Sequence, residues 1–161
     1  KTGLPLTHVD SHQHMHMLPG VIDISLDVAA SLHLDAVRIS RTPLFTAFAG
    51  MGQLIGRLGL FTLSELSLWK AKRRHFRVPE HFEGIVAGEA VHEGHFLHIL
   101  KDLRPGTTEV MMHPGTDNEK LIPACDWEHD FEAEMQAIVS PKVRRMIADK
   151  AVKVVNYRDL K

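Results

Sequence analysis

Histidine or aspartate occupies every second position of one stretch near the start of the chain, from residue 8 to residue 16. In a β-strand successive side chains point to opposite faces, so alternate residues share a face. The residues expected on one face of such a strand are His8, Asp10, His12, His14 and His16. A row of ionisable groups is tolerated where it lines a cavity or holds a cation, because buried charges and imidazoles must be paired or coordinated. The stretch therefore predicts a divalent-metal site.

The number of metal ligands in this stretch is limited by strand geometry. Imidazole nitrogens and carboxylate oxygens are the usual ligands of hydrolytic metals. Side chains on one face climb a strand by ~6.5 Å per step, so they cannot all reach one ion. One or two of them are expected to bind the ion and the rest to orient those ligands. Mg²⁺, Zn²⁺, manganese and cobalt all remain open, and so does the alternative that most of these histidines are exposed or satisfied by neighbours.

A second candidate for chemistry is His113, which follows a compact β-run and precedes Pro114-Gly115. Catalytic side chains of α/β folds stand immediately past buried strands, on the loops that those strands enter. His113 is therefore a candidate proton donor or acceptor. An ordinary turn residue is the alternative.

Strands and helices that would position these residues alternate along the chain. Strands are expected over residues 6–11, 36–40, 107–112 and 152–156. Helices are expected over residues 20–33, 89–100, 128–139 and 141–150, with two helices or a kinked one between 44 and 69. Residues 82–88 and 116–128 are expected to be loops. This order predicts an α/β fold with a parallel sheet and a right-handed first crossover. Because a closed barrel needs about eight strands, the sheet would be incomplete and barrel-like, with flanking helices and with its N-terminal strands missing.

Composition bounds the class of protein. The 161 residues are 44% hydrophobic, which fits a single domain over residues 1–161. With 19 basic and 20 acidic residues, no nucleic-acid partner is expected. The single Cys125 and the lack of a leader or a long apolar run indicate a cytoplasmic protein with no membrane contact. The first residue is Lys1, and the chain is interpreted as lacking its N-terminal part. An uncovered sheet edge leaves a homo-oligomer open.

Four motifs resemble one known family, the YdjC-like carbohydrate deacetylases of the chitooligosaccharide and hopanoid-biosynthesis-associated types. They occur in the family's order across the whole chain. The motifs are Thr7-His8-Val9-Asp10-Ser11-His12-Gln13-His14-Met15-His16, Val37-Arg38-Ile39-Ser40-Arg41, Glu109-Val110-Met111-Met112-His113-Pro114-Gly115 and Tyr157-Arg158-Asp159-Leu160.

The resemblance implies a TIM-barrel-like fold related to polysaccharide deacetylases, a divalent metal, and an acetylated amino sugar as substrate. It implies that His12 is a metal ligand, with Asp10, His14 or His16 orienting it or adding ligands. His113 would be the acid that protonates the departing amine. Arg41 would contact the substrate or form a structural salt bridge. The remaining ligands and the catalytic base would lie upstream, so the chain alone is expected to be inactive.

Two other interpretations remain open. A histidine pair of the kind His12-Gln13-His14 also suits the first strand of an amidohydrolase-type barrel, although later metal ligands are hard to find in this sequence. A non-catalytic module that binds metal or a partner is the other. The non-catalytic interpretation suits an isolated fragment, because this sequence would lack the catalytic base.

Overall fold

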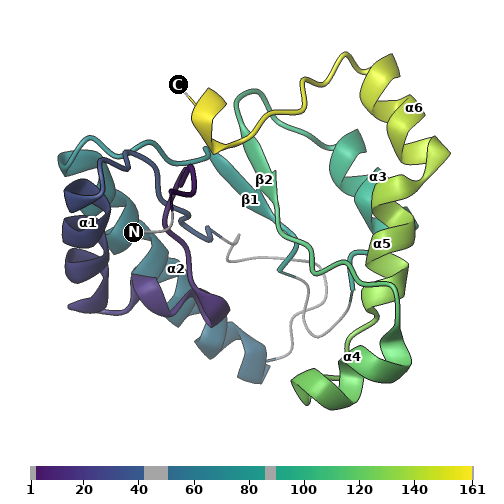
Figure 1. The fold of residues 1–161 in the computed structure, drawn as a ribbon, viewed down its shortest axis with the longest axis horizontal. Coiled ribbons are helices and arrows are strands. Elements are labelled where there is room, and N and C mark those ends of the chain that lie inside the picture. Colours follow the sequence, from purple (N-terminus) through teal and green to yellow (C-terminus); the bar gives the residue numbers. More distant parts are fainter. Residues whose placement is uncertain (1–2, 42–50, 86–89, 161) are drawn as a thin grey trace. The chain divides into compact units, whose positions relative to one another are not determined.

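The computed structural model of the chain describes residues 3–41, 51–85 and 90–160, with the backbone alone described for 51–57. Two compact units make up the chain. The first combines Lys1–Phe82 with Val155–Lys161, and the second is Glu83–Val154. Figure 1 shows the helices and strands of both units in chain order.

Within its described residues, the first unit holds two α-helices and two short 3₁₀ helices. They are η1 (His12–Met17), α1 (Val21–Ser31), α2 (Met51–Arg73) and η2 (Tyr157–Asp159). Helix α1 confirms the helix expected over residues 20–33. In place of the strands expected on either side of it, the described residues have isolated parallel bridges, from Val37 to Val9 and from Ala36 to Arg77. A parallel bridge across a helix is the pairing that a strand–helix–strand unit requires.

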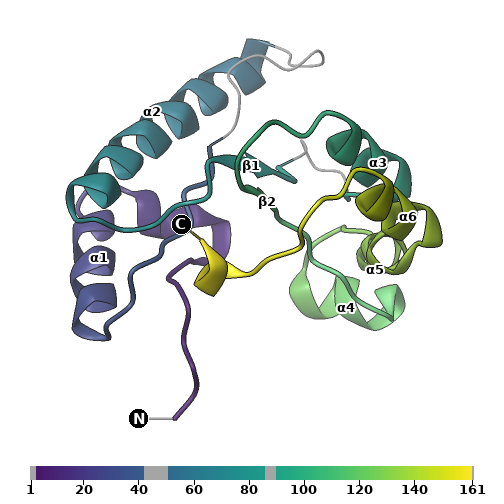
Figure 2. The same cartoon turned by 90° about the horizontal axis from the view of Figure 1, so that it is seen from above.

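Helix α1 packs its apolar face on the core of the first unit. Its buried residues Ile22, Leu26 and Ala29 follow the spacing that lines one side of an α-helix. They meet buried residues of α2 and of the segment after α1 in one cluster, which includes Val37 and Ala71. Figures 1 and 2 both show α1 beside α2. Burial of each large side chain contributes about 1.5–3 kcal/mol, so this cluster stabilises the segment that follows the histidine stretch.

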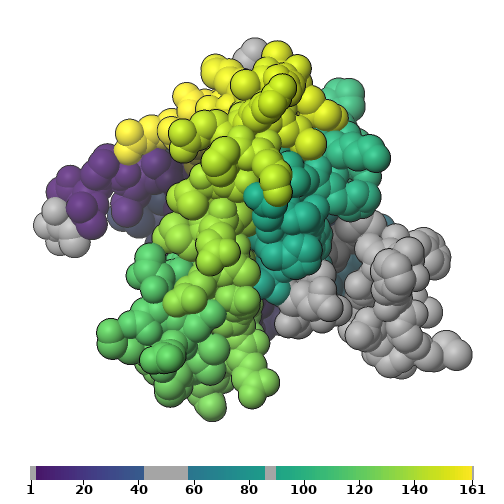
Figure 3. Space-filling model, turned by 90° about the vertical axis from the view of Figure 1, so that its right-hand side faces the viewer, coloured from purple at the N-terminus to yellow at the C-terminus, as the bar shows by residue number. Residues whose placement is uncertain are grey.

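The second unit is mainly helical. Its elements are α3 (Glu93–Lys101), β2 (Thr108–Val110), α4 (Asn118–Cys125), α5 (Phe131–Val139) and α6 (Pro141–Asp149). Helices α3, α5 and α6 contact one another, and Figure 3 shows the yellow-green α6 lying against the teal α3. The helices expected near residues 89–100, 128–139 and 141–150 are thus confirmed. Helix α3 begins later than expected because the His92 side chain caps it, accepting from the His95 N–H at 3.3 Å.

Expectations for two segments of the second half of the chain are wrong. Residues 116–128 contain α4 rather than a loop, because Asp117 caps a helix there by accepting from the Lys120 N–H at 3.1 Å. Residues 152–156 form no strand, since Val152 instead donates to the Ile147 carbonyl at the end of α6. In the described residues one helix, α2, covers most of the region where two helices or a kinked one were expected. The start of the expected helical region, residues 44–50, lies outside the described residues.

Strand β1 (His81–Glu83) pairs with β2 in a two-stranded sheet, where a loop was expected after residue 82. The Met111 N–H donates to the Glu83 carbonyl at 3.0 Å. Gly84 follows with a φ of +100°, and a Cβ there would lie 2.9 Å from the Met111 backbone nitrogen. Only glycine fits this close approach. The α/β class is confirmed, while the barrel stays a prediction.

Candidate functional site

The histidine stretch does not form the continuous strand that its alternation predicted. From His12 the chain turns into η1, where Gln13 and His14 have φ values of 52° and 58°. The cause is local, because the Ser11 hydroxyl accepts from the His16 N–H at 2.9 Å. Such a side-chain bond to the backbone competes with strand pairing. The expectation that all five ionisable side chains share one face is therefore wrong.

His16 and Asp10 hold the turn onto the segment that follows α1. The buried His16 ring makes two hydrogen bonds, from Nδ1 to the Ser11 hydroxyl at 2.8 Å and from Nε2 to the Arg38 carbonyl at 2.7 Å. Asp10 forms an ion pair with the Arg38 guanidinium at 2.6 Å. Both ring nitrogens of His16 are thus engaged by the chain itself. The metal-related roles predicted for Asp10 and His16 stay predictions.

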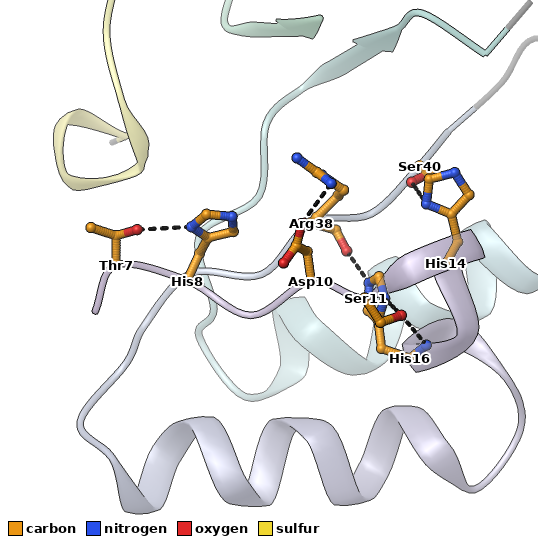
Figure 4. A network of polar contacts seen from close by, with 8 residues as sticks. All are labelled: Thr7, His8, Asp10, Ser11, His14, His16, Arg38 and Ser40. Atoms are coloured by element: carbon orange, nitrogen blue, oxygen red, sulfur yellow. Dashed lines mark hydrogen bonds and ion pairs between the residues drawn. The ribbon is translucent and has the colours of Figure 1, made fainter. Parts of the chain in front are cut away.

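The other two flanking histidines contact different neighbours. The His14 Nδ1 atom lies 2.7 Å from the Ser40 hydroxyl, while the His8 ring stacks on Tyr157 with centroids 3.6 Å apart. Figure 4 shows His8 and His14 at opposite ends of the polar network that surrounds the turn. These contacts fix the backbone on both sides of His12.

His12 itself is exposed at the first residue of η1. An exposed imidazole on a turn that is anchored by its neighbours fits the donor chemistry of one ligand to a divalent ion. Arg41 follows the same segment and pairs with Glu65 of α2, its Nε lying 2.8 Å from a carboxylate oxygen. The salt-bridge alternative for Arg41 thus has a partner, and the substrate role stays a prediction.

A second group of polar side chains lies wholly within the second unit. His113, His129 and Glu134 each offer a ligand atom, and these atoms lie within 4.8 Å of one another. His113 follows β2, His129 precedes α5, and Glu134 stands on α5. The His129 and Glu134 side chains are 4% and 2% exposed, and His113 is half-buried. This group is named the His113 cluster.

Glu134 connects three parts of the second unit. One carboxylate oxygen accepts from the Val91 N–H at 2.8 Å, and the other accepts from the His113 N–H. The first oxygen also lies 3.2 Å from the His129 Nε2 atom. Backbone N–H donors directed at a buried carboxylate stabilise its charge. Glu134 thus holds the His113 turn against α5.

Aromatic rings surround the imidazoles of the His113 cluster. The Trp127 ring stacks on His129 with centroids 4.1 Å apart, and Phe131 meets His129 edge-on at 4.9 Å. The His113 ring lies edge-on to Trp127 at 5.0 Å. These contacts restrict the orientation of both imidazoles.

Gly115 lets the turn after His113 approach α5. Its N–H donates to the Phe131 carbonyl at 2.9 Å. A Cβ at this position would lie 2.9 Å from the Phe131 Cβ and would also overlap the Leu121 side chain. Close packing of this turn against α5 therefore explains why a glycine follows Pro114.

Residues 1–149 match the profile of a family described as YdjC-like protein. The chain belongs to the YdjC-like family.

Curated relatives of this YdjC-like chain come from bacteria and mammals. A carbohydrate deacetylase of Thermoanaerobacter pseudethanolicus is 26% identical over 159 residues, covering 99% of this chain and 54% of that protein. One of Brevibacillus brevis is 22% identical over 160 residues, covering 98% and 55%. One of Mus musculus is 27% identical over 178 residues, covering 96% and 55%. The chain thus spans about half the length of these relatives. No solved structure matches it significantly.

Sequence reasoning missed two residues of the His113 cluster in this YdjC-like chain, His129 and Glu134. A signal was present, because Glu134 lies on the same helical stripe as the buried Phe131 and Ala137. A carboxylate on a core-facing stripe must find partners.

No helix of the described residues is both long and apolar enough to cross a membrane.

Asp130 is the N-cap of α5 and makes a pH-dependent contribution to the stability of this YdjC-like chain. Hydrogen bonds from the Asn118 side chain and the Ala133 N–H lower the pKa of its carboxyl from the ordinary 3.8. A carboxyl with a lowered folded-state pKa contributes fully above the unfolded-state value and loses that contribution as pH falls through the folded-state value. Asp130→Ala is expected to cost about 1 kcal/mol at neutral pH, and less below 3.8. Urea unfolding across this pH range measures it.

The control for this prediction is Asp130→Asn, since asparagine also caps helices but does not titrate. Its stability relative to the parent chain should rise as the pH is lowered through the pKa of Asp130. A pH-independent difference between the two proteins would contradict the prediction.

Proposed function

We propose that this chain is the C-terminal part of a metal-dependent carbohydrate deacetylase, which removes N-acetyl groups from amino sugars or short chitooligosaccharides. The observation that carries the proposal is alignment over 96–99% of the chain with proteins named carbohydrate deacetylase. Residues 1–161 would be part of one TIM-barrel-like domain whose first strands come from an upstream segment. A cytoplasmic location belongs to the proposal, since Cys125 is a free thiol.

His12 would hold the divalent ion together with ligands outside this chain. Its exposure and the anchored turn around it support this role. Bound there, Mg²⁺ or Zn²⁺ supplies Lewis-acid polarisation of the acetyl carbonyl and activation of water. Asp10 and His14 remain candidates for orienting His12, although Asp10 pairs with Arg38 and His14 with Ser40.

His113 would hold a proton on its imidazole and deliver it to the nitrogen of the departing amine. An amine leaves readily only when protonated, so an acid at this position speeds breakdown of the tetrahedral intermediate. The half-buried position and the aromatic rings around His113 support a fixed orientation of the donor. Arg41 would donate hydrogen bonds to sugar hydroxyls from the end of the same segment as Arg38.

Acetate release from N-acetylglucosamine oligomers tests this proposal. The 161-residue chain is expected to release none. A version extended upstream by about a hundred residues, the size needed to complete a barrel, is expected to release acetate. Hydrolysis of other amides or of phosphoesters, but of no acetylated sugar, would overturn the substrate class. Acetate release by the short chain at the rate of the long one would overturn its inactivity.

A further inference from the structure

We propose that the His113 cluster, whose three ligands all belong to the second unit, is a binding site for a divalent transition metal, with Zn²⁺ the best fit. Two imidazoles and one carboxylate form the donor set. They come from the turn that follows β2, from the segment before α5 and from α5 itself. Two histidines and a glutamate are a recurring set of protein ligands for zinc with an open fourth position.

The separation of the ligand atoms is close to that of a metal shell. Bonds of ~2.0–2.1 Å in a tetrahedral site place ligand atoms about 3.4 Å apart. The cluster has these atoms within 4.8 Å of one another, so binding requires a small contraction. His113 is the half-buried member and follows a turn, whereas His129 and Glu134 are buried. Rotation of the His113 ring toward the other two would close the shell.

The His129 Nε2 atom points to a ligand at this position. Among buried side-chain nitrogen and oxygen atoms of the described residues, it is the one without a hydrogen-bond partner. It lies 3.2 Å from a Glu134 oxygen, but the two atoms do not have hydrogen-bond geometry. Buried polar atoms are almost always satisfied, and an ion shared by His129 and Glu134 would satisfy this one.

The surroundings of the cluster would hold its ligands in place. Trp127 stacks on the His129 ring, and two backbone N–H groups bind the Glu134 carboxylate. Outer contacts of this kind orient metal ligands and raise affinity. Two imidazoles favour zinc, cobalt, nickel or copper over magnesium, which prefers oxygen ligands and retains its waters.

Metal in this site would also bear on catalysis, a consequence that rests on the proposed function. A His113 nitrogen that coordinates an ion cannot carry the proton needed by the amine. Binding of zinc here would therefore inhibit the deacetylase, while binding itself is measurable on this chain without any activity.

Trp127 is the built-in reporter for the experiment. The chain has two tryptophans, Trp69 and Trp127, so Trp69→Phe leaves only the one that stacks on His129. Co²⁺, a spectroscopic substitute for Zn²⁺, is titrated into this variant while fluorescence and visible absorption are recorded. We expect stoichiometric quenching with tetrahedral Co²⁺ bands, reversal by Zn²⁺, and no competition from Mg²⁺.

Variants in the Trp69→Phe background locate the ion. His129→Phe preserves the aromatic stack without the ligand nitrogen, and His113→Ala removes a half-buried ligand, so at least one should fold as judged by circular dichroism. Both should lose the quenching and the Co²⁺ bands. His12→Ala and His98→Ala, which change exposed histidines, should retain them. Undiminished quenching in a folded His129→Phe or His113→Ala protein, or its loss in His12→Ala, would overturn the site, as would no quenching in the parent.

Discussion

Replacing Glu134 by leucine is expected to lower the free energy of unfolding of the chain by about 3–5 kcal/mol, because it removes the acceptor of two backbone donors and the ionic neighbour of a buried histidine. The donors are the N–H groups of Val91 and His113. Each buried donor left without a partner costs about 1–3 kcal/mol. A small domain has a total stability of about 5–15 kcal/mol, so urea unfolding should show a large shift of the midpoint or an unfolded protein.

Two controls separate the acceptor role of Glu134 from a general effect of substitution. Glu134→Gln keeps one side-chain oxygen and should therefore lose about half as much stability as Glu134→Leu. Glu128→Leu changes an exposed carboxylate three residues before α5 and should stay within about 0.5 kcal/mol of the parent. Equal effects of leucine at positions 128 and 134 would contradict the role assigned to Glu134.

Most of the helices were predicted from the sequence because their signals are local, whereas α4 was missed. Ile22, Leu26 and Ala29 repeat at helical spacing, and that periodicity follows from backbone geometry alone. Strands depend on partners, which local sequence does not specify. The β-rich residues 152–156 have no ladder partner in the described part of the chain and follow α6 as irregular backbone.

The histidine stretch shows how a short-range contact overrides a pattern. Alternation from His8 to His16 predicts a strand, but one hydroxyl, that of Ser11, binds the His16 backbone and ring and turns the chain. The His113 cluster was hidden for a different reason. Its members are up to 21 residues apart, and only the packing of α5 beside the β2 turn brings them together.

In the protein extended upstream of Lys1, substrates with different leaving groups should distinguish the role of His113 from that of His12. His113→Ala is expected to lower kcat for an N-acetylated sugar by about 10²–10⁴-fold, the usual contribution of a general acid. The same variant should lose far less activity on nitrophenyl acetate, because nitrophenolate departs without a proton. His12→Ala should lose activity on both substrates together with its stoichiometric divalent metal, since polarisation of the carbonyl is needed whatever group leaves.

This comparison distinguishes an acid from a residue that only supports the fold. A structural defect at His113 would lower hydrolysis of amide and ester equally, so an equal loss would contradict its role as proton donor. His98→Ala, which changes an exposed histidine of α3, should leave both rates unchanged. Retention of stoichiometric metal in His12→Ala would contradict the ligand role of His12 even if activity fell. His113 would deliver a proton and His12 would bind a cation. Only the effect of His113→Ala therefore depends on how basic the leaving group is.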